Sequence, residues 1–167
     1  MNLDAAVIVA AGSNLAGDYP SCEALLEAAV AYMGEAGLRI VRRSAWWRSA
    51  AWPAVNMAPE YRNGVLLVEP TLDAHATLSK LLEIERRFGR RRGEANAART
   101  LDLDLIAFGR EVIDVPGLQL PHPRAHERLF VMGPLAQIAP GWRHPVSGAM
   151  AATLAHLASV GRDAAPA

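Results

Sequence analysis

The chain has 167 residues, short enough for a single domain and long enough to bury a core. It is 51% hydrophobic and 20% charged, which is typical of a globular protein, and its single cysteine excludes an intrachain disulfide framework. Seventeen basic residues balance seventeen acidic ones, so no global charge would attract nucleic acid or an anionic membrane.

The first part of the chain predicts a strand, a helix and two further strands. Val7 to Ala10 form a short apolar run, which predicts a central strand buried on both faces. Apolar residues at helical spacing predict a helix over Ser21 to Ala36. Strand composition predicts strands within Arg39 to Arg48 and Gly64 to Glu69. Between them, Ser49 to Pro59 lack any period and are expected to form a loop.

The second part begins with a helix that reaches about Phe88, with Thr71 and Asp73 as candidate N-caps. The elements expected after it are a strand over Thr100 to Phe108, a short extended piece over Leu118 to Leu120, helices over Phe130 to Ile138 and Met150 to Val160, and a frayed tail over residues 161–167. This order predicts an α+β sandwich of the ferredoxin-like group, with a mostly antiparallel sheet flanked by helices.

The sharpest signal for chemistry is the segment Thr100-Leu101-Asp102-Leu103-Asp104-Leu105. On a strand the leucines face one way while Asp102 and Asp104 face the other, about 7 Å apart. The plain interpretation is a strand with one solvated face. However, Asp is a poor strand former, and two neighbouring carboxylates repel each other unless a cation lies between them. We therefore favour a magnesium site, since magnesium combines a few carboxylates with waters and substrate phosphates.

Six arginines and one acid, Glu94, lie between residues 86 and 99, so this window carries six minus one, or +5, net charges. Arg86 and Arg87 are explained by a helix end, where cations are favourable. The others, from Arg90 to Arg99, fall in a predicted loop. A basic loop beside a carboxylate pair is typical of phosphoryl transfer.

Other signals are weaker. No phosphate-binding P-loop motif and no Rossmann glycine motif occurs. His122 lies between two prolines and is followed by Arg124 and Arg128, but a lone loop histidine is more often a surface residue than a base. Glu85 falls on the apolar stripe of its helix, either as a carboxylate that reaches solvent, the commoner case, or as a buried carboxylate with a specific partner.

Several motifs together give a family resemblance: Ala-Gly-Ser-Asn-Leu at 11–15, Arg-Thr-Leu-Asp-Leu-Asp-Leu at 99–105, Pro-His-Pro-Arg at 121–124, Arg-Leu-Phe-Val at 128–131 and Pro-Leu-Ala-Gln-Ile-Ala-Pro at 134–140. The chain resembles the 6-hydroxymethyl-7,8-dihydropterin pyrophosphokinases of folate biosynthesis over nearly its whole length. The resemblance implies transfer of the β,γ-pyrophosphate of ATP to the pterin hydroxymethyl group, with release of AMP. The sequence of this chain differs from that of many family members at residues 94–98, where they carry Trp-Gly-Pro, and at residues 49–51, where they carry Thr-Pro-Pro.

The resemblance also implies roles for individual residues. Asp102 and Asp104 resemble ligands of two magnesium ions, and Arg90, Arg92 and Arg99 resemble residues of a catalytic loop. The implied pterin-binding residues are Ser49, Ala50, Trp52, Tyr61, Asn63 and Phe130. The implied ATP-binding residues are Glu85, His122 and Arg128.

The implied enzyme is a cytoplasmic monomer that uses two Mg²⁺ ions, ATP and the pterin, and needs neither nucleic acid nor a membrane. No apolar stretch approaches the roughly 20 residues required to cross a bilayer, and the first residues lack the basic segment of a signal peptide. No covalent intermediate is expected, and the acceptor of the hydroxyl proton, Asp104 or a metal-assisted route, stays open.

Two rival functions remain at the level of sequence. A nucleic-acid-binding module would grip phosphates with the arginine loop, but the chain lacks an RNP-type aromatic strand pattern. A metal-dependent nuclease would use the same aspartate pair and ignore the pterin. Turnover of ATP that depends on both pterin and magnesium separates the three.

Overall fold

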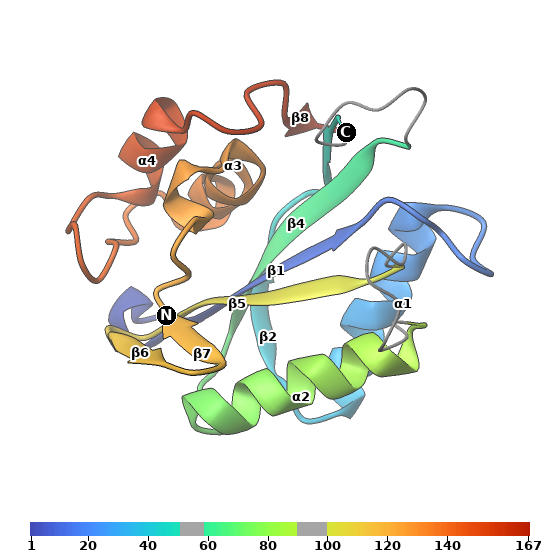
Figure 1. The fold of residues 1–167 in the computed structure, drawn as a ribbon, viewed down its shortest axis with the longest axis horizontal. Coiled ribbons are helices and arrows are strands. Elements are labelled where there is room, and N and C mark those ends of the chain that lie inside the picture. The colour runs from blue at the N-terminus through green and yellow to red at the C-terminus, as the bar shows by residue number, and fades with distance from the viewer. Residues whose placement is uncertain (51–58, 90–99) are drawn as a thin grey trace.

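The computed structural model describes residues 1–50, 59–89 and 100–167, and Figure 1 shows its ribbon. The elements in chain order are η1 (Leu3–Ala5), β1 (Val7–Ser13), α1 (Cys22–Glu35), β2 (Ile40–Arg43), β3 (Trp47–Ser49), β4 (Tyr61–Val68), α2 (Ala74–Arg87), β5 (Asp102–Phe108), β6 (Ile113–Val115), β7 (Leu118–Leu120), η2 (Ala125–Glu127), α3 (Leu129–Ile138), α4 (Ala151–Leu157) and β8 (Ala165–Pro166), where η marks a short 3-10 helix.

Six of the strands form one sheet in the order β5-β1-β4-β3-β8, with β2 paired to β4 beside β3. Every pairing among these strands is antiparallel. Strand β1 lies between β4 and β5, which confirms the predicted central strand. Strand β5 is an edge strand, and β6 and β7 form a separate hairpin next to it.

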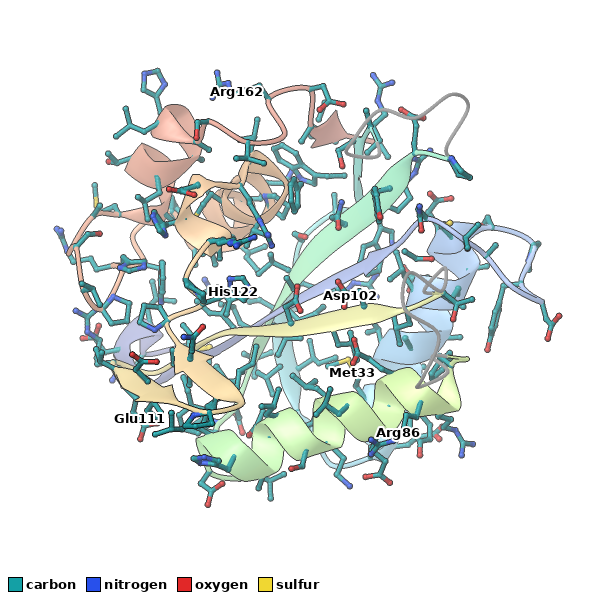
Figure 2. The ribbon with its side chains drawn as sticks, viewed as in Figure 1. Met33, Arg86, Asp102, Glu111, His122 and Arg162 are labelled. Carbon is teal, nitrogen blue, oxygen red and sulfur yellow. The ribbon has the colours of Figure 1, made fainter. Side chains whose placement is uncertain are left out.

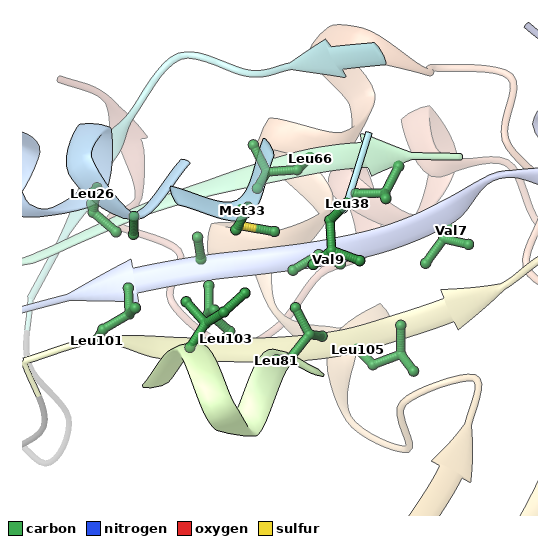
Figure 3. Close-up of a cluster of buried hydrophobic side chains, with 14 of the residues drawn as sticks. Val7, Val9, Leu26, Met33, Leu38, Leu66, Leu81, Leu101, Leu103 and Leu105 are labelled. Carbon is green, nitrogen blue, oxygen red and sulfur yellow. The ribbon is translucent and has the colours of Figure 1, made fainter. Parts of the chain in front are cut away.

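Two apolar clusters cover the two faces of the sheet, as the helices on either side of it show (Figure 1). On one face, leucines and valines of β1, β4 and β5 pack against α1 and α2 (Figure 3). On the other face, Ile8, Val65 and Leu67 pack with residues of α3 and α4. This arrangement confirms the predicted α+β sandwich.

The two long helices begin where side chains cap them. The Ala24 N–H donates to Ser21 Oγ at 3.1 Å, and the Ala76 N–H donates to Asp73 Oδ1 at 2.8 Å, so Asp73 rather than Thr71 is the N-cap of α2. Helices α1 and α2 each have 14 residues. No helix in the described part of the chain is long and apolar enough to cross a membrane.

The region predicted as one strand over Arg39 to Arg48 is two strands, β2 and β3. The break falls at Ser44, whose side-chain oxygen accepts the N–H of Val65 at 2.9 Å, and β2 itself carries a register shift between Ile40 and Arg42. A side chain has therefore replaced a backbone acceptor where the strand ladder would have continued.

The predicted frayed tail over residues 161–167 is wrong. Ala165 and Pro166 form β8, which pairs with Arg48 and Trp47 at the edge of the sheet. The last predicted helix is also shorter than expected, ending at Leu157, because backbone N–H groups just beyond it turn to bond η2 instead. The short strand β6 was not predicted.

Candidate active site

The antiparallel register places four residues from four strands in one row across the sheet. Trp47 is paired with Asn63, Asn63 with Gly12, and Gly12 with Asp102. Directly paired residues in antiparallel strands project from the same face. The row therefore lies on the α3 side of the sheet, with Val65, two positions along β4 from Asn63, in the apolar cluster of that side.

The predicted alternation on β5 is confirmed. Leu101, Leu103 and Leu105 are buried toward α1 and α2 (Figure 3), whereas Asp102 and Asp104 are half-buried on the opposite face. The alternation stops after Leu105, where the register with β1 shifts by one residue. The two carboxylates thus lie together next to an irregularity of the kind that is frequent beside active sites.

Glu85 holds the strand that carries the two aspartates. It is only 1% exposed, and its Oε2 accepts the N–H of Leu103, the residue between them, at 2.8 Å. Because β5 is an edge strand, its outward N–H groups need acceptors from outside the sheet. The expectation that this carboxylate reaches solvent is wrong, because a specific backbone partner retains it in the interior.

A cavity of about 700 Å³ opens beside the aspartates, between α2, β5 and the β6–β7 hairpin. This volume is within the range of small-molecule sites, about 300 to 1,000 Å³. Leucines of α2, β5 and β7 line it together with polar side chains. The residues that matter for its chemistry are Leu78, Glu85, Asp102, Asp104, Gln119 and His122.

His122 stands in the segment that leads from β7 to η2, and Figure 2 labels it together with Asp102. Its backbone N–H donates to the carbonyl of Ile106 at 2.8 Å, and its Nδ1 accepts the N–H of Arg124 at 3.2 Å. Burial lowers the pKa of His122, and the charges of Arg128 and Arg124 lower it further, while Asp102 opposes them. This direction favours the neutral ring, and because Nδ1 accepts the Arg124 N–H, the neutral ring carries its proton on Nε2 as a donor.

The amide of Asn63 has a fixed position. Its Nδ2 donates to Ser49 Oγ at 3.3 Å, and its Oδ1 lies over Gly12, where a Cβ would be only 2.5 Å from it. Ser49 is buried and is paired with Tyr61, two residues before Asn63 on the same face. An amide held in this way offers a fixed donor and acceptor pattern to a flat polar ring.

Helix α3 contributes Phe130 near its start, and the Arg128 guanidinium carbon lies 5.7 Å from the centre of that ring. Further along α3, Gly133 allows the indole of Trp47 to lie directly against the helix, since a Cβ at Gly133 would be 2.6 Å from the ring. The Trp47 Nε1 donates to Gln137 Oε1 at 3.0 Å. Trp47 thus joins α3 to the row on the sheet.

A sequence model of the family described as 7,8-dihydro-6-hydroxymethylpterin-pyrophosphokinase (HPPK) matches residues 8–140. The chain belongs to the HPPK family. The 2-amino-4-hydroxy-6-hydroxymethyldihydropteridine pyrophosphokinase of Pseudomonas aeruginosa is 36% identical over 139 residues, covering 83% of each protein. The protein of that name from Synechocystis is 43% identical over 113 residues, covering 68% of this chain. The latter alignment spans only 57% of the Synechocystis protein.

A solved structure titled "Crystal Structure Analysis of the HPPK-DHPS in complex with substrates" has a TM-score of 0.71 at 13% identity, covering 90% of this chain and 42% of that chain. At this identity the similarity concerns the fold. It agrees with the predicted HPPK-type sandwich.

Within this HPPK chain, the structure brings most of the predicted site residues together around the sheet row and the cavity. Four of the predicted residues, Trp52, Arg90, Arg92 and Arg99, lie outside the described residues. The described pair Asp102 and Asp104 joins the two halves of the site, with His122 and the cavity on one side and Asn63 on the other.

The sheet row contains two residues that the sequence does not single out for the candidate site, Gly12 and Trp47. Glycine inside a strand often marks the close approach of another group, and at Gly12 that group is the Asn63 amide. A tryptophan such as Trp47 is expected by default to pack in the core. Only the register that sets Trp47 against Asn63 shows that it belongs to the polar row.

Proposed function

We propose that the chain transfers the β,γ-pyrophosphate of ATP to the hydroxymethyl group of 6-hydroxymethyl-7,8-dihydropterin, producing AMP and the pterin diphosphate. Membership of the HPPK family supports this activity. The structural observation that carries the proposal is the position of Asp102 and Asp104 between a cavity and the fixed amide of Asn63. A triphosphate and an acceptor ring would meet at that pair.

ATP is proposed to occupy the cavity beside β5. Its volume and its leucine lining suit a nucleoside, and His122 is among its polar lining residues. The neutral His122 ring offers its Nε2 proton to a phosphate oxygen, while Arg128 supplies positive charge. Glu85 lines the same cavity, and its proposed effect on ATP is indirect: it accepts the Leu103 N–H and so fixes the position of β5.

The donor set at Asp102 and Asp104 fits magnesium. Both side chains are half-buried on one face, and magnesium is usually bound by one or two carboxylates together with waters and substrate phosphates. We propose that these two residues hold two magnesium ions, which supply charge neutralisation on the phosphate oxygens.

The pterin is proposed to lie over the sheet row. We propose that Asn63 recognises its polar edge, that Tyr61 and Phe130 enclose its ring, and that Ser49, Ala50 and Trp52, the last outside the described residues, contribute to its binding. The fixed direction of the Asn63 amide supports this assignment, because its Nδ2 is already directed toward Ser49 and its Oδ1 toward Gly12. Selective recognition of such a ring needs donors and acceptors that are fixed before binding.

In the proposed reaction the pterin hydroxyl oxygen attacks the β-phosphorus. The new C–O–P linkage forms as the bond from that phosphorus to the α,β-bridging oxygen breaks, AMP leaves with that oxygen, and the hydroxyl proton is lost to Asp104 or by a metal-assisted route. The protein positions both substrates and neutralises charge, with Arg90, Arg92 and Arg99 proposed as the arginines that act on the phosphates. Since one chain carries residues for both substrates, we propose that it acts as a monomer.

The test is to incubate the purified chain with ATP, magnesium and the hydroxymethyl dihydropterin, and to measure AMP and the pterin diphosphate. The proposal expects both products only when all three components are present. A nuclease would instead cleave nucleic acid without the pterin. Release of ADP or inorganic phosphate in place of AMP would contradict the proposal.

A further inference from the structure

The last nine residues, 159–167, connect the two sides of the proposed pterin site, and we call this segment the C-terminal brace. It begins beside α3, where the Val160 N–H donates to the Glu127 carbonyl and the Leu129 N–H donates to the Val160 carbonyl, both at 2.9 Å. It ends on β3 as the edge strand β8, and the Ala167 N–H donates to the Trp46 carbonyl at 3.0 Å. The brace lies beyond residue 140, where the match to the family model ends.

At its first contact with the site, the brace supports Phe130. Gly161 has a φ of +71°, and a Cβ built on it would lie 2.5 Å from Phe130 Cδ1. Only glycine combines this left-handed backbone with so close an approach of an aromatic ring. The backbone of the brace thus forms a surface against which the Phe130 ring rests.

Two residues later the brace contacts the opposite side of the site. The Ala50 N–H donates to Asp163 Oδ2 at 2.7 Å. This is a charge-assisted hydrogen bond, and it fixes the backbone immediately after Ser49. Ser49 in turn accepts the Nδ2 proton of Asn63, so the carboxylate acts one step away from the amide that is proposed to read the pterin.

We propose that Asp163 is a positioning residue for pterin binding. It holds the end of β3 so that Ser49 keeps the Asn63 amide oriented, while Gly161 in the same segment sets the position of Phe130. The inference rests on the proposed function and extends it to a segment that carries none of the residues assigned to either substrate. Asp163 itself does not touch the ring; it acts through Ala50 and Ser49.

Two substitutions separate this role from a general effect of charge. Asp163→Ala removes the acceptor for the Ala50 N–H, and we expect the pterin Kd to rise by about fivefold to tenfold, less than the full worth of a charged hydrogen bond because Asp163 acts on the ring only through Ala50 and Ser49. Asp163→Asn keeps an oxygen acceptor at the same place, so its pterin Kd should stay within about twofold of the unchanged chain. The Kd for ATP should be unaffected in both, since the cavity beside β5 does not include the brace.

The matched control is Asp73→Ala. Asp73 also accepts a backbone N–H, from Ala76 at 2.8 Å, but at the start of α2. This control loses the same charge and the same kind of bond, and because the bond caps a helix away from the proposed pterin site, the pterin Kd should stay unchanged.

The experiment titrates each variant with the dihydropterin, following its fluorescence, and measures ATP affinity and AMP formation in parallel. A weaker pterin affinity in Asp163→Ala alone, with rescue by Asp163→Asn, supports the inference. An unchanged pterin Kd in Asp163→Ala, or an equal loss in the Asp73→Ala control, overturns it while the proposed function stands. If the unchanged chain neither binds the pterin nor forms AMP, the proposed function fails and this inference falls with it.

Discussion

Gly12 provides the sharpest test of the site, because alanine at this position changes one contact and little else. Gly12 lies in β1 between Asn63 on one neighbouring strand and Asp102 on the other. An alanine Cβ there would be 2.5 Å from Asn63 Oδ1 and 3.5 Å from the Arg62 carbonyl oxygen. The second distance is an ordinary contact, so the clash falls on the Asn63 amide alone.

The size of the effect follows from that distance. Carbon and oxygen atoms are comfortable at about 3.5 Å, so the amide must move by about 1 Å. A shift of this size misaligns the hydrogen bonds proposed between Asn63 and the pterin, and losing two of them costs roughly 2 to 3 kcal/mol, or about 30-fold to 150-fold in Kd. Alanine in a strand also gains about 0.5 to 1 kcal/mol over glycine, which offsets the local strain. We therefore expect a large loss of pterin affinity in a protein of nearly unchanged stability.

The assay compares pterin fluorescence titration, ATP binding and urea unfolding for Gly12→Ala and for a control, Gly34→Ala. Gly34 lies in α1, and a Cβ on it meets nothing within 4 Å. The control should be more stable by about 1 kcal/mol and bind the pterin normally. If Gly12→Ala bound the pterin as tightly as the control, the assignment of the Asn63 amide to the pterin would be wrong.

Three other predictions follow from the same structure. Asp102→Asn or Asp104→Asn should lower kcat by about a hundredfold or more in the AMP assay at saturating magnesium, and near-normal turnover would refute their role. Glu85→Ala removes the buried acceptor of the Leu103 N–H and should lower the free energy of unfolding by about 2 to 3 kcal/mol in urea titrations; a loss below about 1 kcal/mol would contradict the structural role. Burial lowers the pKa of His144, and the nearby His126 and Arg110 lower it further, so the His144 ring binds a proton less readily in the folded protein than in the unfolded chain. The contribution of the neutral His144 to stability should therefore be fully present above the unfolded-state pKa of about 6.5, and it should be lost as the pH drops below that value. Thermal unfolding across pH should show a smaller loss of stability at low pH for His144→Asn than for the unchanged chain. An identical pH profile of the two would exclude the histidine as the source of the loss.

Local features of the site were predictable because they depend on neighbours in sequence. The alternation of leucine and aspartate on β5 needs only the two-residue period of a strand, and it places both carboxylates on one face. The capping of α2 by Asp73 needs only a backbone N–H three residues ahead. In both cases the feature depends on residues that are close in sequence, so strand periodicity and N-cap preference are enough to predict it.

Features that depend on distant partners were not predictable in the same way. Helical periodicity places Glu85 on the inner face of α2, but it cannot supply the Leu103 N–H, 18 residues later, that makes burial favourable. The tail composition, Ala-Ala-Pro-Ala, carries no strand signal, and β8 exists because β3 offers an unpaired edge. Whether a carboxylate is buried, or a weak strand pairs, depends on a partner that is distant in sequence, and the local sequence does not identify that partner.

The row of Trp47, Asn63, Gly12 and Asp102 shows why the site as a whole belongs to this second kind. These residues come from four strands, and the pairing register alone aligns them. A slip of β1 by one residue would exchange Gly12 for Ala11 or Ser13 opposite Asn63, and it would turn Val7, Val9 and Ala11 away from α1 and α2. The core against α1 and α2, which contains Val7, Val9 and Ala11, opposes that slip. The packing of one face of the sheet therefore fixes the geometry of the polar site on the other face.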